Sequence, residues 1–179
     1  LRKMPLENLM PTIQNINLMG NKLHTPQAVK NLGYILERIS GIQTLNLSKT
    51  FLNYMNFNDL SPNFRRVHYE LNLSINNFND QLPILTHLAH LKVLNLSRTG
   101  LTGASIRNIA KLLSSDNHLQ WKVLILNHNK LNNDDIHELL LSLKGNKCLE
   151  SLDVSYNCFD EQGLKDFDES LQNSVLKTI

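Results

Sequence analysis

Two histidines three residues apart, His87 and His90, are the closest approach to a metal-binding motif in this sequence. An H-x-x-H pair can supply two ligands to zinc, which also needs further imidazole, thiolate or carboxylate ligands. The pair lies within LTHLAHLKVL, and no cysteine or acidic cluster follows at ligand spacing. We therefore interpret both histidines as surface residues and expect neither a metal nor another cofactor.

Motifs for nucleotide binding and nucleophilic catalysis are also missing. Neither G-x-x-x-x-G-K-S/T nor G-x-G-x-x-G occurs, so no phosphate-binding loop is predicted. No G-x-S-x-G turn is present to expose a catalytic serine. Cys148 and Cys158 are interpreted as small buried hydrophobic residues, with a disulfide between them as the alternative. The sequence thus favours a protein that is not an enzyme.

Composition and charge narrow the class of partner. The chain has 179 residues, of which 41% are hydrophobic, enough for one domain with a substantial core. A net charge of +2 gives no electrostatic reason to expect nucleic acid or an anionic membrane. No apolar run approaches the ~20 residues that cross a bilayer. Two isolated cysteines fit a reducing compartment, so we expect a cytoplasmic protein with a protein partner.

A repeated pattern, L-x-x-L-x-L-x-x-N/T-x-L, dominates the chain, and such self-similarity indicates a stack of equivalent units. Full copies begin at Ile13, Ile42, His68, Leu91, Trp121 and Leu149, and a shortened copy begins at Leu176. The six full copies read IQNINLMGNKL, IQTLNLSKTFL, HYELNLSINNF, LKVLNLSRTGL, WKVLILNHNKL and LESLDVSYNCF. We number these units one to six in chain order.

The pattern predicts a short strand in each unit. The x-L-x-L stretch alternates, so its two leucines point to one side and can be buried only by stacking on neighbouring units. The polar ninth position can satisfy backbone groups where the chain leaves the strand, which predicts a buried hydrogen-bonded ladder. Its members are Asn21, Thr50, Asn76, Thr99, Asn129 and Asn157.

Four connections between strands are expected to be helical. Thr25 and Pro26 form a helix start, and Asn133 and Asp160 are expected to cap two later helices. The buried stripes are Val29, Leu32, Leu36 and Ile39; Ile106, Ile109 and Leu113; Ile136, Leu139, Leu140 and Leu143; and Leu164, Phe167 and Leu171. The connections over 56–67 and 80–90 contain proline and no long stripe, so a short helix, a 3₁₀ turn or an extended path is expected there.

These repeats resemble the leucine-rich-repeat superfamily over residues 13–179, and the longer units are most similar to the ribonuclease-inhibitor-like class. The shorter third unit is closer to bacterial and plant classes, and the composition is similar to leucine-rich-repeat effectors of intracellular bacterial pathogens, which are secreted into the host cell. The resemblance implies an α/β fold, a curved solenoid with a parallel concave sheet and helical or extended convex returns. It also implies a single domain over 1–179 that binds proteins.

The strand residues that alternate with the leucines would face a partner. Asparagine fills four successive central positions, at Asn17, Asn46, Asn72 and Asn95, which is either consensus filling or a polar contact stripe. Interface energy concentrates in aromatic residues and arginine. We therefore predict a contact patch on units four to six, and Trp121 is interpreted as core. The predicted partner-binding residues are Arg98, Ile125, His128, Asp153, Tyr156 and, as a further aromatic, Tyr69.

Two other functions stay open. A GTPase-activating protein of the ribonuclease-inhibitor-like class would need a polar residue at a strand end, for which Arg98 and Asn95 are the candidates. A structural spacer between other domains is the second alternative. We also expect residues 1–12 to form a partial cap, and further chain or domains beyond Ile179.

Overall fold

The computed structural model describes residues 13–79, 81–82, 85–115, 118–165 and 167–179, so the cap expected over 1–12 lies outside the described residues. Strands and helices alternate, and the strands form one six-stranded, all-parallel sheet in chain order. The strands are β1 (Asn15–Asn17), β2 (Ile42–Asn46), β3 (Val67–Asn72), β4 (Val93–Asn95), β5 (Val123–Ile125) and β6 (Ser151–Asp153). The fold is therefore α/β, with each strand beside the next one along the chain.

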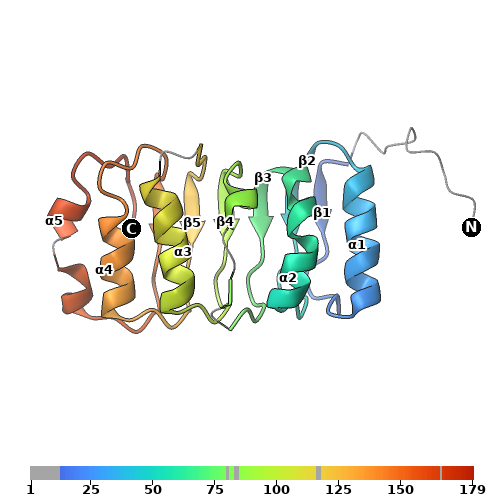
Figure 1. Cartoon of the computed structure of the whole chain (residues 1–179), viewed down its shortest axis with the longest axis horizontal. Helices are drawn as coiled ribbons and strands as arrows, with labels where there is room; N and C mark the ends of the chain where they lie inside the picture. The colour runs from blue at the N-terminus through green and yellow to red at the C-terminus, as the bar shows by residue number, and fades with distance from the viewer. Residues whose placement is uncertain (1–12, 80, 83–84, 116–117, 166) are drawn as a thin grey trace, which may run out of the picture.

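The helices lie together on one face of the sheet, in front of the strands in Figure 1. The α-helices are α1 (Pro26–Arg38), α2 (Tyr54–Leu60), α3 (Gly103–Ser114), α4 (Asn133–Leu141) and α5 (Phe167–Ser170). Three 3₁₀ helices complete the connections, η1 (Ser61–Arg66), η2 (Leu85–Leu88) and η3 (Glu161–Leu164). The opposite face of the sheet, which we call the open face, carries none of these helices.

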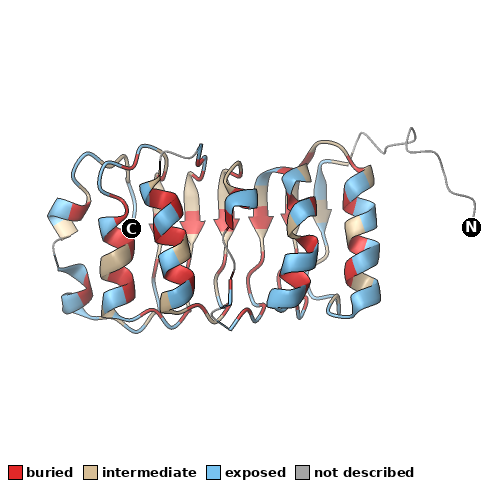
Figure 2. Ribbon diagram, viewed as in Figure 1, coloured by how far each residue is buried: buried red, intermediate tan, exposed pale blue. Residues whose placement is uncertain are grey.

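The register of the sheet aligns the repeated leucines. Leu45 pairs with Leu71 and Leu94 pairs with Leu124, and these side chains are at most 1% exposed. Ile16, in the first strand, is only half-buried because it has a strand neighbour on one side. In Figure 2 parts of the strands and of the helices are coloured as buried. The predicted strands and their inward-facing leucines are confirmed.

The asparagine ladder is confirmed in the middle of the stack. Asn129 Oδ1 accepts hydrogen bonds from the backbone N–H groups of Thr99 and Leu101, and its Nδ2 donates to the carbonyls of Leu96 and Leu126. Asn76 and Asn157 bridge their units in the same way. Each buried amide thus ties the turn of one unit to the unit before it.

The predicted starts of two helices have different outcomes. Thr25 caps α1 by accepting from the backbone N–H of Ala28, with Pro26 as the first helical residue, as predicted. The cap of α4 is Asn132 rather than Asn133, because Asn132 forms a reciprocal capping box with Asp135. Asn133 instead exchanges hydrogen bonds with Asp160 of the following unit.

The prediction of one continuous helix after unit six is wrong. Asp160 does act as a cap, accepting from the N–H of Gln162, but the helix it starts is the short η3 and α5 is separate. Leu164, predicted to be buried, is 42% exposed. Gly163 is a poor helix former, and a Cβ there would lie 3.1 Å from the side-chain oxygen of Asn133, so this turn packs tightly against α4.

The remaining connections follow the expectation. The connection over 56–67 is the short helix α2 with η1, and the connection over 80–90 contains the 3₁₀ turn η2. At the carboxyl end, Thr178 forms a parallel bridge with Ser151, in line with the start of a seventh strand. Among the described residues no helix is long and apolar enough to span a membrane.

The sequence also predicts that Trp121, Cys148 and Cys158 are buried. Trp121 is fully buried, and its indole N–H donates to the Leu88 carbonyl, which confirms it as a core residue. Both cysteines are free thiols. The prediction that they are buried is wrong, because Cys148 is half-buried and Cys158 is exposed. Cys158 lies at a variable template position beside the core residue Phe159, where the side chain turns outward.

Candidate functional site

The central stripe of the open face is polar for a structural reason. The side-chain oxygens of Asn17, Asn46, Asn72 and Asn95 each accept a hydrogen bond from the backbone N–H two residues later, at 2.9–3.0 Å. Side chains of this kind satisfy backbone groups where a strand ends. The four asparagines therefore satisfy the backbone where each strand ends.

Ile125 interrupts that stripe. In the register it follows Asn95 and precedes Asp153, and it is half-buried. Val93 and Val123, which pair with each other on the same face, are also half-buried. These three residues, which we call the apolar centre, give β4 and β5 a hydrophobic surface. The earlier strands carry asparagines at the central position instead.

Asp153 closes the apolar centre on the side of β6. Its carboxylate accepts from Asn127 Nδ2 at 2.6 Å and from the backbone N–H and hydroxyl of Ser155. Burial alone would raise the pKa of Asp153, but these hydrogen bonds and the nearby His128 outweigh it and lower the pKa. Asp153 is therefore an ionised, well-satisfied boundary group.

A second row of side chains runs along the carboxyl ends of the strands. It consists of Lys49, Ile75, Arg98, His128 and Tyr156, which we call the carboxyl-edge row. All five have a left-handed backbone, with φ between 53° and 55°. This conformation costs an L-residue about 1–2 kcal/mol relative to glycine and is least favourable for β-branched residues such as Ile75. The row thus places large side chains where the backbone would favour glycine or asparagine.

Within this row the last three side chains contact one another. Arg98 Nη2 lies 3.3 Å from His128 Nε2, and the rings of His128 and Tyr156 stack with centroids 4.2 Å apart and planes 2° from parallel. Arginine can only donate, so His128 Nε2 is the acceptor in this contact. The structure therefore brings Arg98, His128 and Tyr156 together, beside Ile125 and Asp153 on the adjoining strands.

Tyr69 does not join them. It lies near the amino end of β3 and is 49% exposed. Six residues separate it from Ile75, the carboxyl-edge residue of the same unit, which places the two about 20 Å apart along an extended strand. The sequence singled out Tyr69 for its size, but its template position puts it at the opposite edge of the sheet.

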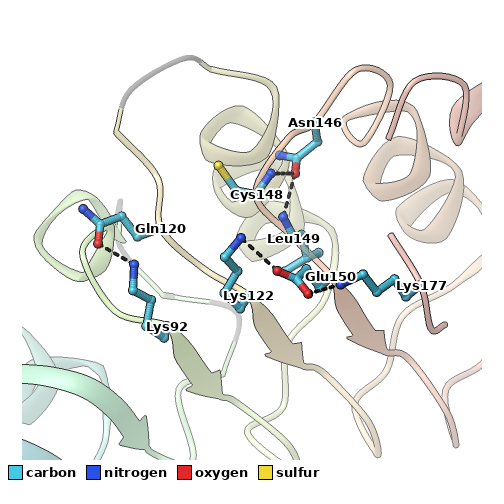
Figure 3. A network of polar contacts seen from close by, with 8 residues as sticks. All are labelled: Lys92, Gln120, Lys122, Asn146, Cys148, Leu149, Glu150 and Lys177. Carbon is cyan, nitrogen blue, oxygen red and sulfur yellow. Dashed lines mark hydrogen bonds and ion pairs between the residues drawn. The ribbon is translucent and has the colours of Figure 1, made fainter. Parts of the chain in front are cut away.

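That opposite edge is a charged row of its own, the amino-edge row, with Tyr69, Lys92, Lys122 and Glu150 at equivalent template positions. Figure 3 shows its contacts. Glu150 binds both Lys122, at 2.9 Å, and Lys177. The hydrogen bonds from Lys177 and then Lys122 lower the pKa of Glu150 to about 2. Lys92 instead donates to the Gln120 side chain at 2.8 Å.

The sequence reasoning did not single out Phe51, an exposed aromatic residue at the carboxyl edge of the sheet. Phe51 is 56% exposed, has φ 63° and packs edge-on against His24. With Ile75 and Arg98 it lines an open groove of about 500 Å³ at the carboxyl edge. Phe51 immediately precedes the last leucine of its template. The other units hold Lys22, Asn77, Gly100, Lys130 and Cys158 at this position, so a large aromatic residue there was the available signal.

The other residues considered for metal binding or for action on a GTPase are either exposed or hydrogen-bonded within the protein. His87 is exposed, as expected, whereas His90 is half-buried and its Nε2–H donates to the Val67 carbonyl at 2.7 Å. Over the described residues no three His, Cys, Asp or Glu side chains cluster in a way that could hold a metal. Asn95 and Arg98, the candidates for action on a GTPase, are engaged with Ser97 and His128.

Comparison with models of known protein families finds none that matches this chain, and no curated protein matches it.

Proposed function

We propose that this protein is a leucine-rich-repeat solenoid, mostly of the ribonuclease-inhibitor-like class, that binds a protein partner on its open face. The aligned leucines, the asparagine ladder and the helices gathered on one face all support this assignment. Helices are thicker than strands, so stacking them on one side curves the sheet and makes the open face concave. A concave, helix-free face is the surface that such an array offers to a partner.

The observation that carries the proposal is the interruption of the polar stripe at Ile125. The preceding asparagines accept hydrogen bonds from their own strand ends through their side chains, whereas the side chain of Ile125 is apolar and half-buried. Apolar groups at the centre of a patch, surrounded by polar and aromatic groups, are typical of interaction sites. The Arg98–His128–Tyr156 group supplies those neighbours at the carboxyl edge.

No observation favours the GTPase-activating alternative. Asn95 is already the acceptor for its own strand end, and Arg98 donates to His128. The cytoplasmic location and the similarity to bacterial effectors remain predictions.

A matched pair of variants tests the proposed face. A library of random peptides displayed on phage is selected on the immobilised full chain, and the enriched peptides are measured by calorimetry. Ile125→Asp should weaken their binding at least tenfold, whereas Leu141→Asp, an exposed apolar position on α4, should leave it unchanged. The reverse pattern would place binding on the helical face and refute the proposal.

A further inference from the structure

Two positive side chains stand at opposite ends of the strand that borders the apolar centre. Lys92 immediately precedes β4, and Arg98 lies three residues beyond its end. Their six-residue separation corresponds to about 20 Å in an extended chain. Val93 follows Lys92 directly, and Val123 and Ile125 lie on the adjoining β5. Along the direction of β4, the two edges of the sheet therefore each carry a cation, with the apolar centre between them.

Neither cation is neutralised within the described residues. Lys92 contacts the amide oxygen of Gln120, and Arg98 contacts the imidazole of His128. By contrast, Lys122 and Lys177 share Glu150, and Lys144 pairs with Glu169. Lys92 and Arg98 are thus positions where a partner can supply the negative charge.

The carboxylates near the patch limit where an acidic partner can lie. Glu70 pairs in register with Val93, on the side of β3, and Asp153 lies beyond Ile125, on the side of β6. Asp153 already accepts three hydrogen bonds, so it has little need of a cation from a partner. An acidic segment that crosses the strands would meet both charges, whereas one that runs along β4 passes only Glu70, beside the start of that strand.

Arg98 is prepared for a carboxylate by its neighbours. Its contact with His128 fixes the guanidinium, and His128 is itself stacked on Tyr156. A guanidinium held in one orientation loses less side-chain entropy on binding and can offer two parallel N–H donors to one carboxylate.

From this arrangement we propose that the partner contributes an acidic segment that lies along β4, with a large apolar residue between carboxylates that meet Lys92 and Arg98. The inference rests on the proposed function, because it assumes binding on the open face. A phosphodiester backbone fits less well, because among the described residues that border the apolar centre only Lys92 and Arg98 are cations without a carboxylate partner, and both Glu70 and Asp153 flank the patch.

The test is a charge swap read through peptide selection. The random library is selected in parallel on the full chain, on Lys92→Glu/Arg98→Glu and on Lys30→Glu/Lys111→Glu, a control with the same charge change on exposed helical positions. The full chain and the control should enrich peptides with acidic residues on both sides of an apolar one. The charge-swapped variant should enrich basic flanks and bind the acidic peptides at least tenfold more weakly. Circular dichroism melting verifies that each variant is folded.

The outcomes separate the two proposals. Enriched peptides that depend on Ile125 but have neutral or basic flanks overturn the acidic-segment inference and leave the open face as the binding site. Enriched peptides that are insensitive to both Ile125→Asp and the charge swap overturn the proposed function. A failure to enrich any peptide overturns the acidic segment, and tighter binding of oligothymidine than of the acidic peptides replaces it with nucleic acid.

Discussion

The imidazole ring of His128 lies parallel to the phenol ring of Tyr156, with centroids 4.2 Å apart, and its Nε2 faces the Arg98 guanidinium at 3.3 Å. The three residues come from successive units and occupy the same template position. Their shared left-handed backbone aims the side chains along the same edge of the sheet. Residues at a variable template position thus make a contact between units that the sequence alone does not reveal.

Removing the ring of Tyr156 should weaken partner binding through Arg98. Tyr156→Ala leaves His128 without its stacking partner, so Arg98 loses its fixed orientation. A stacked pair contributes about 1 kcal/mol, so we expect a fivefold to tenfold rise in the Kd of the selected peptides. Tyr156→Phe keeps the ring and should stay within twofold. Calorimetry measures both, and equal losses in the two variants would assign the effect to the hydroxyl instead.

Truncating the ladder should destabilise the fold far more at the centre than at the start of the stack. Asn129→Ala leaves the backbone N–H groups of Thr99 and Leu101 without partners and removes one of two donors from each of two carbonyls, which should lower the free energy of unfolding by about 3 kcal/mol. Asn21 is exposed and donates only to Leu18 of its own unit, so Asn21→Ala should cost below about 1 kcal/mol. Urea denaturation compares the two, and similar losses would refute a ladder that works between units.

Relieving the left-handed backbone at Ile75 should stabilise the protein. Asparagine tolerates this conformation better than a β-branched residue, so Ile75→Asn should raise the free energy of unfolding by about 1 kcal/mol. Because Ile75 is 44% exposed, the loss of buried apolar surface is small. Leu141→Asn, at a similarly exposed position with an ordinary helical backbone, should not stabilise. Urea denaturation gives both values, and destabilisation by Ile75→Asn would contradict the strain argument.

The pKa of Glu150, and with it the stability of the protein at acidic pH, should depend on Lys177. Its hydrogen bond is the largest cause of the lowered pKa of Glu150, so Lys177→Met should raise that pKa from about 2 towards 4.5. Because the folded-state pKa lies below the unfolded one, the contribution of Glu150 to stability is complete above pH 4.5 and is lost as the pH falls towards 2. Carboxyl NMR titration measures the shift directly. A pKa that stays near 2 without Lys177 would assign the effect to Lys122 alone.

The fold was predictable because the same residue types recur at fixed template positions. Leu94 and Leu124 are buried and in register for the reason that the alternation implies, and Asn129 is buried because four backbone groups need it. Prediction failed where the connection after unit six depends on a contact between units. The close approach of Gly163 to Asn133 is invisible in the hydrophobic spacing that suggested a continuous helix.

The candidate site was predictable only in part. Large side chains at variable positions identified Arg98, His128 and Tyr156, but size alone could not separate them from Tyr69, which lies at the other edge. The role of the asparagine stripe needed the hydrogen bonds to backbone N–H groups, because sequence periodicity is the same for a contact surface and for a structural cap. Pairing of charges such as Lys122 with Glu150 also depends on side-chain geometry.

Trp121, the one tryptophan of the sequence, joins the fifth unit to the end of η2 through its bond to the Leu88 carbonyl. Its indole is fully buried, so its emission should be blue in the folded protein and move to longer wavelength when water reaches it. Because Trp121 lies where the connection that contains η2 meets the following helical units, its emission will respond to separation of the stack at that junction. The molecule thus carries an intrinsic, label-free reporter of the contact between Trp121 and the connection that contains η2.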